Sequence, residues 1–256
     1  YISTGGLPYR KHTIAWNQLL VCIEGEMLIR LENGQQQSTR SCLIKAGTLI
    51  DDGNIDISGA TIAIYYLSPV SQKFVVLLGQ MSSASEGLSY RHPLENDLVR
   101  EFRFILHQAL SPNQVYDLIQ GVIIEPHLRK VIKKKFDPRV INILHRIRES
   151  VTENIPISDL ATGVCLSESR LKKLFKEQIG IPITKYRIQY RLIVATALMV
   201  AGYSITDAAL MAGFSSSAHF STCYSGMVGI QPSLPFLKPP YMNAYIADDV
   251  LAFISP

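Results

Sequence analysis

Two stretches of the chain, residues 158–182 and 206–232, carry side chains of the types that bind nucleic acid. Lysine and arginine attract phosphate and donate hydrogen bonds to guanine, while serine and threonine hydroxyls can donate or accept. The first stretch is basic, but residues 213–232 hold no lysine or arginine. The candidate contact residues are Ser167, Ser169, Arg170, Lys172, Lys173 and Lys176 in the first stretch, and Ser215, Ser217, Ala218, Ser221 and Thr222 in the second.

The two stretches repeat one pattern, which predicts a helix-turn-helix motif in each. A small residue, Ala161 or Ala209, lets two helices cross closely, and the apolar turn residue follows five positions later. A serine predicted as a helix N-cap comes next, then a helix with one buried stripe, then a glycine that ends it. The repeated positions are Leu166 and Phe214 in the turn, Ser167 and Ser215 at the cap, Leu171, Leu174 and Phe175 against Phe220, Cys223 and Tyr224 in the stripe, and Gly180 and Gly229 at the end.

The segment from Ile183 to Val200 separates the two motifs and is predicted to be one long helix. At 1.5 Å per residue it spans about 27 Å. Successive major-groove faces on one side of a duplex are about 34 Å apart. Two motifs joined by such a helix could therefore enter adjacent turns of DNA.

The order and spacing of these elements, with the texts RLIVATALM and AGFSSSAHFS, resemble the AraC/XylS family of bacterial transcription regulators. The resemblance covers about residues 137–232. It implies that base edges are read by Ser169, Lys172 and Lys173 in the first motif, and by Ser217, Ala218, Ser221 and Thr222 in the second. Family members often carry basic residues where Thr222, Ser225 and Gly226 stand, and Pro235 disturbs the closing text. We therefore expect the first motif to supply more of the affinity, with the second anchoring phosphate.

The rest of the chain predicts a two-domain α+β fold. Short strand-like runs up to about Pro69, with a hairpin turn at Asn33-Gly34, indicate a small antiparallel barrel or sandwich. By the resemblance, residues 1–82 are a cupin-like antiparallel β-barrel that serves as effector or interaction domain. Residues 83–136 are a helical linker and candidate dimerisation region, and residues 137–240 an all-α domain with both motifs. The tail, 241–256, is assigned no role.

A small-molecule effector is expected to bind inside the barrel. The candidate wall residues are Tyr9, His12, Trp16 and Tyr66, although aromatic residues there can equally be plain core. Catalysis is not expected, because no HxH sequence, nucleophile–base pair or phosphate-binding glycine loop occurs. We expect no metal and no cofactor.

Composition agrees with a globular, DNA-binding protein. The net charge is +4, and residues 138–240 hold eleven basic and six acidic side chains, an excess of +5. The four widely spaced cysteines suggest reduced thiols and a cytoplasmic protein. No apolar run reaches the length of a membrane span, and no signal peptide is visible, although the chain begins at Tyr1 rather than Met.

The favoured function is a sequence-specific transcription regulator, an activator, with promoter DNA and RNA polymerase as partners. The apolar stripes of residues 94–132 predict a homodimer; the alternative is that they pack on the chain's own barrel. A second hypothesis is a regulator that acts through protein–protein contacts and binds DNA weakly. A third, a small-molecule cupin enzyme, would require bound metal.

Overall fold

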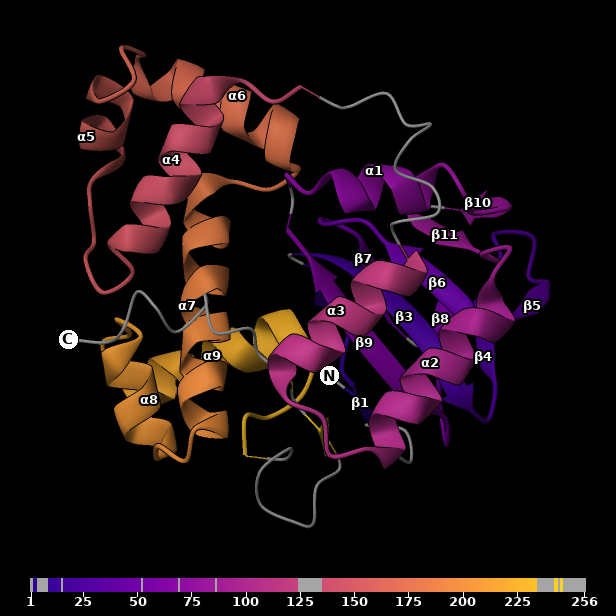
Figure 1. The fold of residues 1–256 in the computed structure, drawn as a ribbon. Coiled ribbons are helices and arrows are strands. Elements are labelled where there is room, and N and C mark those ends of the chain that lie inside the picture. Colours follow the sequence, from indigo (N-terminus) through magenta and orange to yellow (C-terminus); the bar gives the residue numbers. More distant parts are fainter. Residues whose placement is uncertain are drawn as a thin grey trace.

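The computed structural model describes residues 2–3, 9–14, 16–51, 53–68, 70–85, 87–123, 135–233, 242–243 and 245. Within them the chain forms an N-terminal domain of antiparallel sheets with helices and a C-terminal domain of helices, which lie side by side (Figure 1). The two-domain α+β prediction is confirmed. Residues 124–134, which were predicted to be helical, lie outside the described residues, as do residues 234–240 at the end of the predicted C-terminal domain.

The N-terminal domain contains one large and two small antiparallel sheets, in the orders β10-β11-β6-β3-β9-β1-β12, β5-β4-β8 and β2-β7. The predicted hairpin is confirmed, since β4 pairs with β5 across Gly34, whose φ of +79° suits glycine. The strands are β1 (Ile2–Ser3), β2 (His12–Thr13), β3 (Asn17–Glu24), β4 (Met27–Arg30), β5 (Gln36–Thr39), β6 (Ser41–Ile44), β7 (Leu49–Ile50), β8 (Ile55–Asp56), β9 (Thr61–Leu67), β10 (Ser83–Ser85), β11 (Leu88–Tyr90) and β12 (Met242–Asn243).

The sheets do not close into the expected barrel. Among the described residues the large sheet ends at β10 on one side and β12 on the other, without a ladder joining them. Instead, one apolar layer of the domain lies between the sheets, where Leu20, Met27 and Ile29 are buried. The N-terminal domain is therefore an open sandwich.

Three elements of this domain differ from the sequence prediction. The helix α1 (Gln72–Leu78) was not expected, and β10 and β11 extend the large sheet past residue 82, into the region predicted as a helical linker. The tail, which was assigned no role, returns as β12, which pairs with β1. The pairings β11–β6 and β12–β1 join residues far apart in sequence, so no local pattern predicts them.

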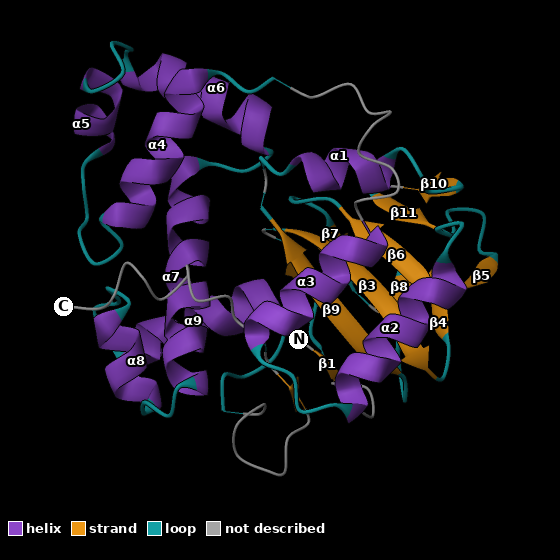
Figure 2. Ribbon diagram, viewed as in Figure 1, coloured by secondary structure: helices purple, strands orange, loops and turns teal. Residues whose placement is uncertain are grey.

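Helices α2 (Glu95–His107) and α3 (Pro112–Ile123) cover one face of the large sheet (Figure 2). Their apolar stripe, with Leu98, Phe102 and Ile119, is buried in one cluster with Leu19 and Val21 of β3. Ser111 caps α3 as expected, since its hydroxyl accepts from the Gln114 N–H at 3.3 Å. The stripe that predicted a dimer thus packs on the chain's own sheet, and the dimer stays a prediction.

The C-terminal domain consists of six helices in the described residues, arranged around the long α7 (Figure 1). Asp137 caps the first of them, with Pro138 at the first helical position, where the sequence placed the domain boundary. No helix among the described residues has the length and apolarity needed to cross a membrane. The six are α4 (Pro138–Glu149), α5 (Ile157–Thr162), α6 (Glu168–Ile179), α7 (Ile183–Val200), α8 (Ile205–Met211) and α9 (Ser217–Val228).

Candidate nucleic-acid interface

The two predicted motifs have the same turn. The N–H of Leu166 donates to the Ala161 carbonyl, and the N–H of Phe214 to the Ala209 carbonyl, each at 3.0 Å. The residue before each apolar turn residue has a left-handed backbone, with φ of +55° at Cys165 and +84° at Gly213. Repeated hydrogen bonds and dihedrals confirm that α5–α6 and α8–α9 are copies of one helix-turn-helix. We call α6 and α9 the first and second recognition helices.

The first recognition helix matches the prediction closely. Ser167 is its N-cap, and its hydroxyl accepts from the Arg170 N–H at 3.3 Å. Leu171 and Phe175 are fully buried, which turns the opposite face to solvent. The candidate contact residues Ser167, Ser169, Arg170, Lys172, Lys173 and Lys176 are all exposed on this helix or its cap.

Two of these lysines are paired with carboxylates on the same helix. Lys172 Nζ lies 2.8 Å from Glu168 Oε2, and Lys173 Nζ lies 3.9 Å from Glu177 Oε1. All four side chains are about half exposed or more, and such pairs contribute only about 0.2–1 kcal/mol. A phosphate or base can therefore displace the carboxylates at low cost.

The second recognition helix differs from the prediction at its cap. Its N-cap is Ser216, whose hydroxyl accepts from the His219 N–H at 3.1 Å, and the predicted cap Ser215 lies one residue earlier. Ser215 Oγ instead lies 3.1 Å from His219 Nδ1. The turn after Phe214 holds one residue more than the first motif does, so counting from the aromatic residue placed the cap too early.

The exposed face of the second recognition helix is narrow, and two of its hydroxyl groups already form hydrogen bonds within the helix. Ser217 and Ser221 are half-buried, whereas Ala218 and Thr222 are exposed. The hydroxyls of Ser221 and Thr222 donate to the Ser217 and Ala218 carbonyls, at 2.8 and 3.0 Å. This helix therefore offers fewer free polar groups to a duplex than α6 does.

His219 is a candidate contact that sequence reasoning missed. It is exposed on the first turn of α9, with its ring edge-on to Phe214 at a centroid distance of 5.5 Å. The signal was its position next to Ala218, at the N-terminal end that usually enters the groove. An imidazole there can donate to phosphate or accept from a base.

The helix α7 holds the two motifs apart as predicted, from Ile183 to Val200. Figure 1 shows α6 near one end of α7 and α9 near the other. Two arginines of α7 fasten the loop between α4 and α5: Arg191 Nε donates to the Val151 carbonyl at 2.8 Å, and Arg187 to the Ile155 carbonyl at 2.7 Å. These bonds to backbone carbonyls indicate a structural role for both guanidiniums, whose pKa burial lowers.

Both recognition helices end against the N-terminal domain. Each ends at a left-handed glycine, Gly180 or Gly229, which lies next to atoms of that domain. A Cβ atom on Gly180 would lie 3.5 Å from the Ala46 carbonyl oxygen, and one on Gly229 only 2.6 Å from His12 Nδ1. Each helix has twelve residues, so its serine-capped start lies about 18 Å from that contact, free for a ligand.

A cavity of about 520 Å³ extends from the space between the N-terminal sheets, where Leu20, Ile44 and Ile55 line it, to the C-terminal domain. All four residues predicted to contact an effector line it. Helices α7 and α9 form one of its walls, which the sequence could not reveal. We call it the junction cavity; its lining includes Tyr9, His12, Trp16 and Tyr66 from the N-terminal domain and Gln189 and Tyr224 from the C-terminal domain.

Burial keeps the titratable rings of the junction cavity uncharged. It lowers the pKa of His12, although a hydrogen bond to the Arg10 carbonyl opposes this. It raises the pKa of Tyr66 to about 12 and also raises the pKa of Tyr224. In the described part of the chain, no three His, Cys, Asp or Glu side chains lie together as a metal site would require.

Comparison with known proteins supports the motif. Residues 160–234 match the family model of a helix-turn-helix domain. The chain is 30% identical over 137 residues to the HTH-type transcriptional regulator GbdR of Pseudomonas aeruginosa, covering 52% of this chain and 37% of that protein. It is 29% identical over 104 residues to the transcriptional regulatory protein HptR of Staphylococcus aureus, covering 40% and 41%. The chain thus matches less than half the length of either relative.

Two solved structures of ToxT from Vibrio cholerae share the fold. An apo ToxT variant has a TM-score of 0.57 at 14% identity, over 91% of this chain and 94% of that chain. Wild-type ToxT bound to an unsaturated fatty acid has a TM-score of 0.54 at 16% identity, over 91% of each chain. At sequence identities this low, the comparison shows a likeness in fold alone.

Proposed function

Through residues 160–234 the chain belongs to the helix-turn-helix transcription regulators of the AraC type, and on that premise we propose that it activates transcription by binding promoter DNA sequence-specifically. One observation carries the proposal: two serine-capped recognition helices lie near the two ends of one 18-residue helix, and each ends against the N-terminal domain (Figure 1). That arrangement suits adjacent major-groove faces of a duplex.

The two recognition helices have different tasks in this proposal. The first carries Arg170, Lys172, Lys173 and Lys176 and contributes most of the affinity through phosphate and guanine contacts. The second is neutral and adds phosphate anchoring through its capped N-terminus and His219. Its opposite end, with Tyr224 and Met227, lines the junction cavity.

The junction cavity is the proposed effector site. Its volume lies within the range usual for small-molecule sites, and its lining is mainly apolar. A ToxT structure of the same fold holds an unsaturated fatty acid, which supports a small-molecule effector here. Because α7 and α9 form part of the wall, a bound effector would touch the helix that sets the spacing of the two motifs.

A homodimer and contact with RNA polymerase complete the proposal. The candidate dimer surface is the exposed side of α2, where Phe104 is 47% exposed. Sedimentation at micromolar concentration tests the dimer, and a single species of 28.5 kDa would contradict it.

The salt dependence of binding to duplexes selected from a random DNA pool tests the proposed function. Binding through several phosphates weakens steeply with salt, with a slope of about −0.9 per phosphate neutralised. A flat response, or no duplex binding, would favour the second candidate, a regulator that acts mainly through protein contacts. The neutral face of α9 is the observation that keeps this candidate open.

A further inference from the structure

Three buried polar atoms have no hydrogen-bond partner among the described residues: Ser3 Oγ, Trp16 Nε1 and Gln189 Oε1. Their residues are only 5%, 8% and 7% exposed. All three residues line the junction cavity. Buried polar groups are nearly always paired, so three orphaned atoms around one cavity indicate a ligand that pairs with them.

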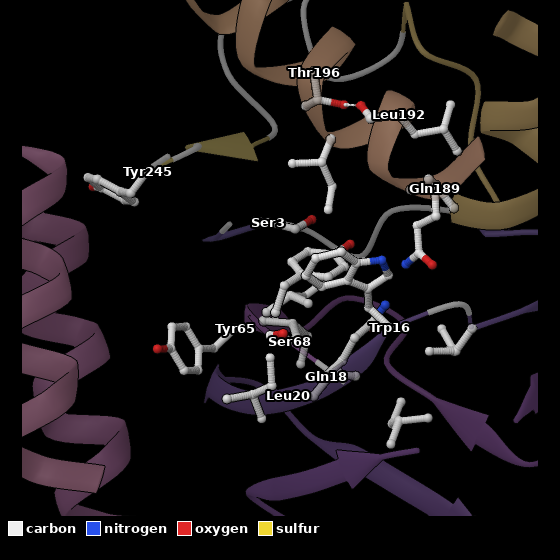
Figure 3. A pocket seen from close by; sticks show the side chains of 18 of the residues that line it. Ser3, Trp16, Gln18, Leu20, Tyr65, Ser68, Gln189, Leu192, Thr196 and Tyr245 are labelled. Atoms are coloured by element: carbon white, nitrogen blue, oxygen red, sulfur yellow. Dashed lines mark hydrogen bonds between the residues drawn. The ribbon is translucent and has the colours of Figure 1, made fainter. Parts of the chain in front are cut away.

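The orphaned atoms come from both domains. Ser3 and Trp16 belong to the N-terminal domain, and Gln189 belongs to α7. The Trp16 ring stacks on Tyr186 of α7, with centroids 6.1 Å apart and planes 10° apart, and Gln189 lies one helical turn further on. In the close view, Trp16 and Gln189 point toward one another from the two sides (Figure 3). An unpaired N–H donor and an unpaired carbonyl acceptor thus line the same cavity.

The charges around the cavity argue against a cationic ligand. Its described lining contains no aspartate or glutamate, and its two permanent charges are the cations Lys73 and Arg148. Each cation already has hydroxyl partners: Lys73 Nζ lies 3.1 Å from Tyr116 Oη, and Arg148 donates to Tyr186 Oη at 3.3 Å and Ser68 Oγ at 3.4 Å. Both cations therefore already have hydrogen-bond partners.

We propose that the junction cavity binds an uncharged, mainly apolar molecule whose head group both accepts and donates hydrogen bonds, as a primary amide does. The head group accepts from Trp16 Nε1 and donates to Gln189 Oε1, with Ser3 Oγ as a further partner. An anion could satisfy Trp16 but would leave the Gln189 oxygen unpaired and would have to be desolvated. This inference rests on the proposed function of the cavity as the effector site.

The sequence supplies a direct readout, because Trp16 is the chain's one tryptophan. Titration with decanamide should change its fluorescence saturably, whereas decylamine should have no effect. Sodium decanoate, which has the same chain length, should bind at least about tenfold more weakly than decanamide. Its carboxylate has no hydrogen to donate, so Gln189 Oε1 stays unpaired. Equal or tighter binding of decanoate would overturn the uncharged head group, and no binding of any of the three would overturn the ligand class.

Two substitutions on α7 separate recognition from packing. Gln189→Leu removes the orphaned acceptor, so it should reduce decanamide affinity by about tenfold while leaving the thermal midpoint of the free protein unchanged or raised. Thr196→Val is the matched control: its hydroxyl lines the same cavity but already donates to the Leu192 carbonyl at 2.7 Å, so decanamide affinity should not change.

The competing arrangement is a direct Trp16–Gln189 hydrogen bond formed by turning the Gln189 amide. In that case Gln189→Leu would lower the thermal midpoint and leave decanamide binding unchanged, which would overturn the proposal. DNA binding of the ligand-free protein is measured in parallel. Intact duplex binding without binding of any probe would defeat this inference alone, whereas loss of duplex binding in the unsubstituted protein would defeat the proposed function.

Discussion

The backbone N–H of Arg10 donates to the carbonyl of Gly229 at 2.7 Å, which joins the N-terminal domain to the end of the second recognition helix. Gly229 closes α9 with a φ of +81°, and its Cα faces the His12 ring so closely that no Cβ would fit. The neutral recognition helix is therefore held at its C-terminal end by the N-terminal domain.

Gly229→Ala should weaken this contact. The left-handed backbone costs an alanine about 1–2 kcal/mol, and the clash with His12 adds to it. In urea unfolding, Gly229→Ala should lower the free energy of unfolding more than Gly202→Ala does. At Gly202 φ is +97°, but nothing lies within 4 Å of the added Cβ. Gly226→Ala, in the open interior of α9, should instead stabilise by about 0.5–1 kcal/mol. Similar losses at Gly229 and Gly202 would show that the contact with His12 is unimportant.

Ser216→Ala should destabilise the second motif more than Ser215→Ala. Loss of a serine N-cap costs about 1 kcal/mol, because the N–H it caps is left unpaired. Ser215 caps no backbone group, and its bond to His219 is exposed, so its removal should change the free energy of unfolding by less than about 0.5 kcal/mol. Denaturant midpoints of the two variants compare them directly; the reverse order would restore Ser215 as the cap.

Acidification should loosen the junction through His12. Burial puts the pKa of His12 in the folded state below its ordinary value of 6.5, so the unfolded chain binds a proton more readily. The stability that neutral, buried His12 contributes to the folded state is present above about pH 6.5. It is lost as the pH falls toward the pKa of His12 in the folded state. The thermal midpoint should therefore decline over this window, and His12→Asn should flatten the decline. The Asp137 carboxyl does not interfere, because Arg139 lowers its pKa to about 2 and it titrates at lower pH. An unchanged slope in His12→Asn would reject this role.

Much of the C-terminal domain could be predicted from local signals. Ser167, Gly180 and Gly229 fix where helices begin and end through their own backbone preferences, and the span of α7 follows from its uninterrupted helical text. The cap at Ser216 was missed because adjacent serines carry the same propensity, and only the extra turn residue decides between them.

The parts that could not be predicted depend on contacts distant in sequence. Trp16 was expected to line an effector site, but nothing near it reveals that it stacks on Tyr186 of the other domain. Gln189 shows no local sign of a site, since its exposure to the cavity follows from how the two domains pack. The open sheet likewise depends on β12 reaching β1, a pairing of the two ends of the chain.

The central claim, that the first recognition helix contributes most of the DNA affinity, is tested most directly by gel shift of matched alanine variants. Lys172→Ala and Lys173→Ala should each weaken specific binding by about 1–3 kcal/mol. Ser221→Ala and Thr222→Ala should each weaken binding by less than about 0.5 kcal/mol, because both hydroxyls already donate to carbonyls of their own helix. Arg30→Ala removes the same charge from the small sheet of the N-terminal domain and should leave affinity unchanged. Equal losses in the two helices, or a larger loss in the second, would contradict the account.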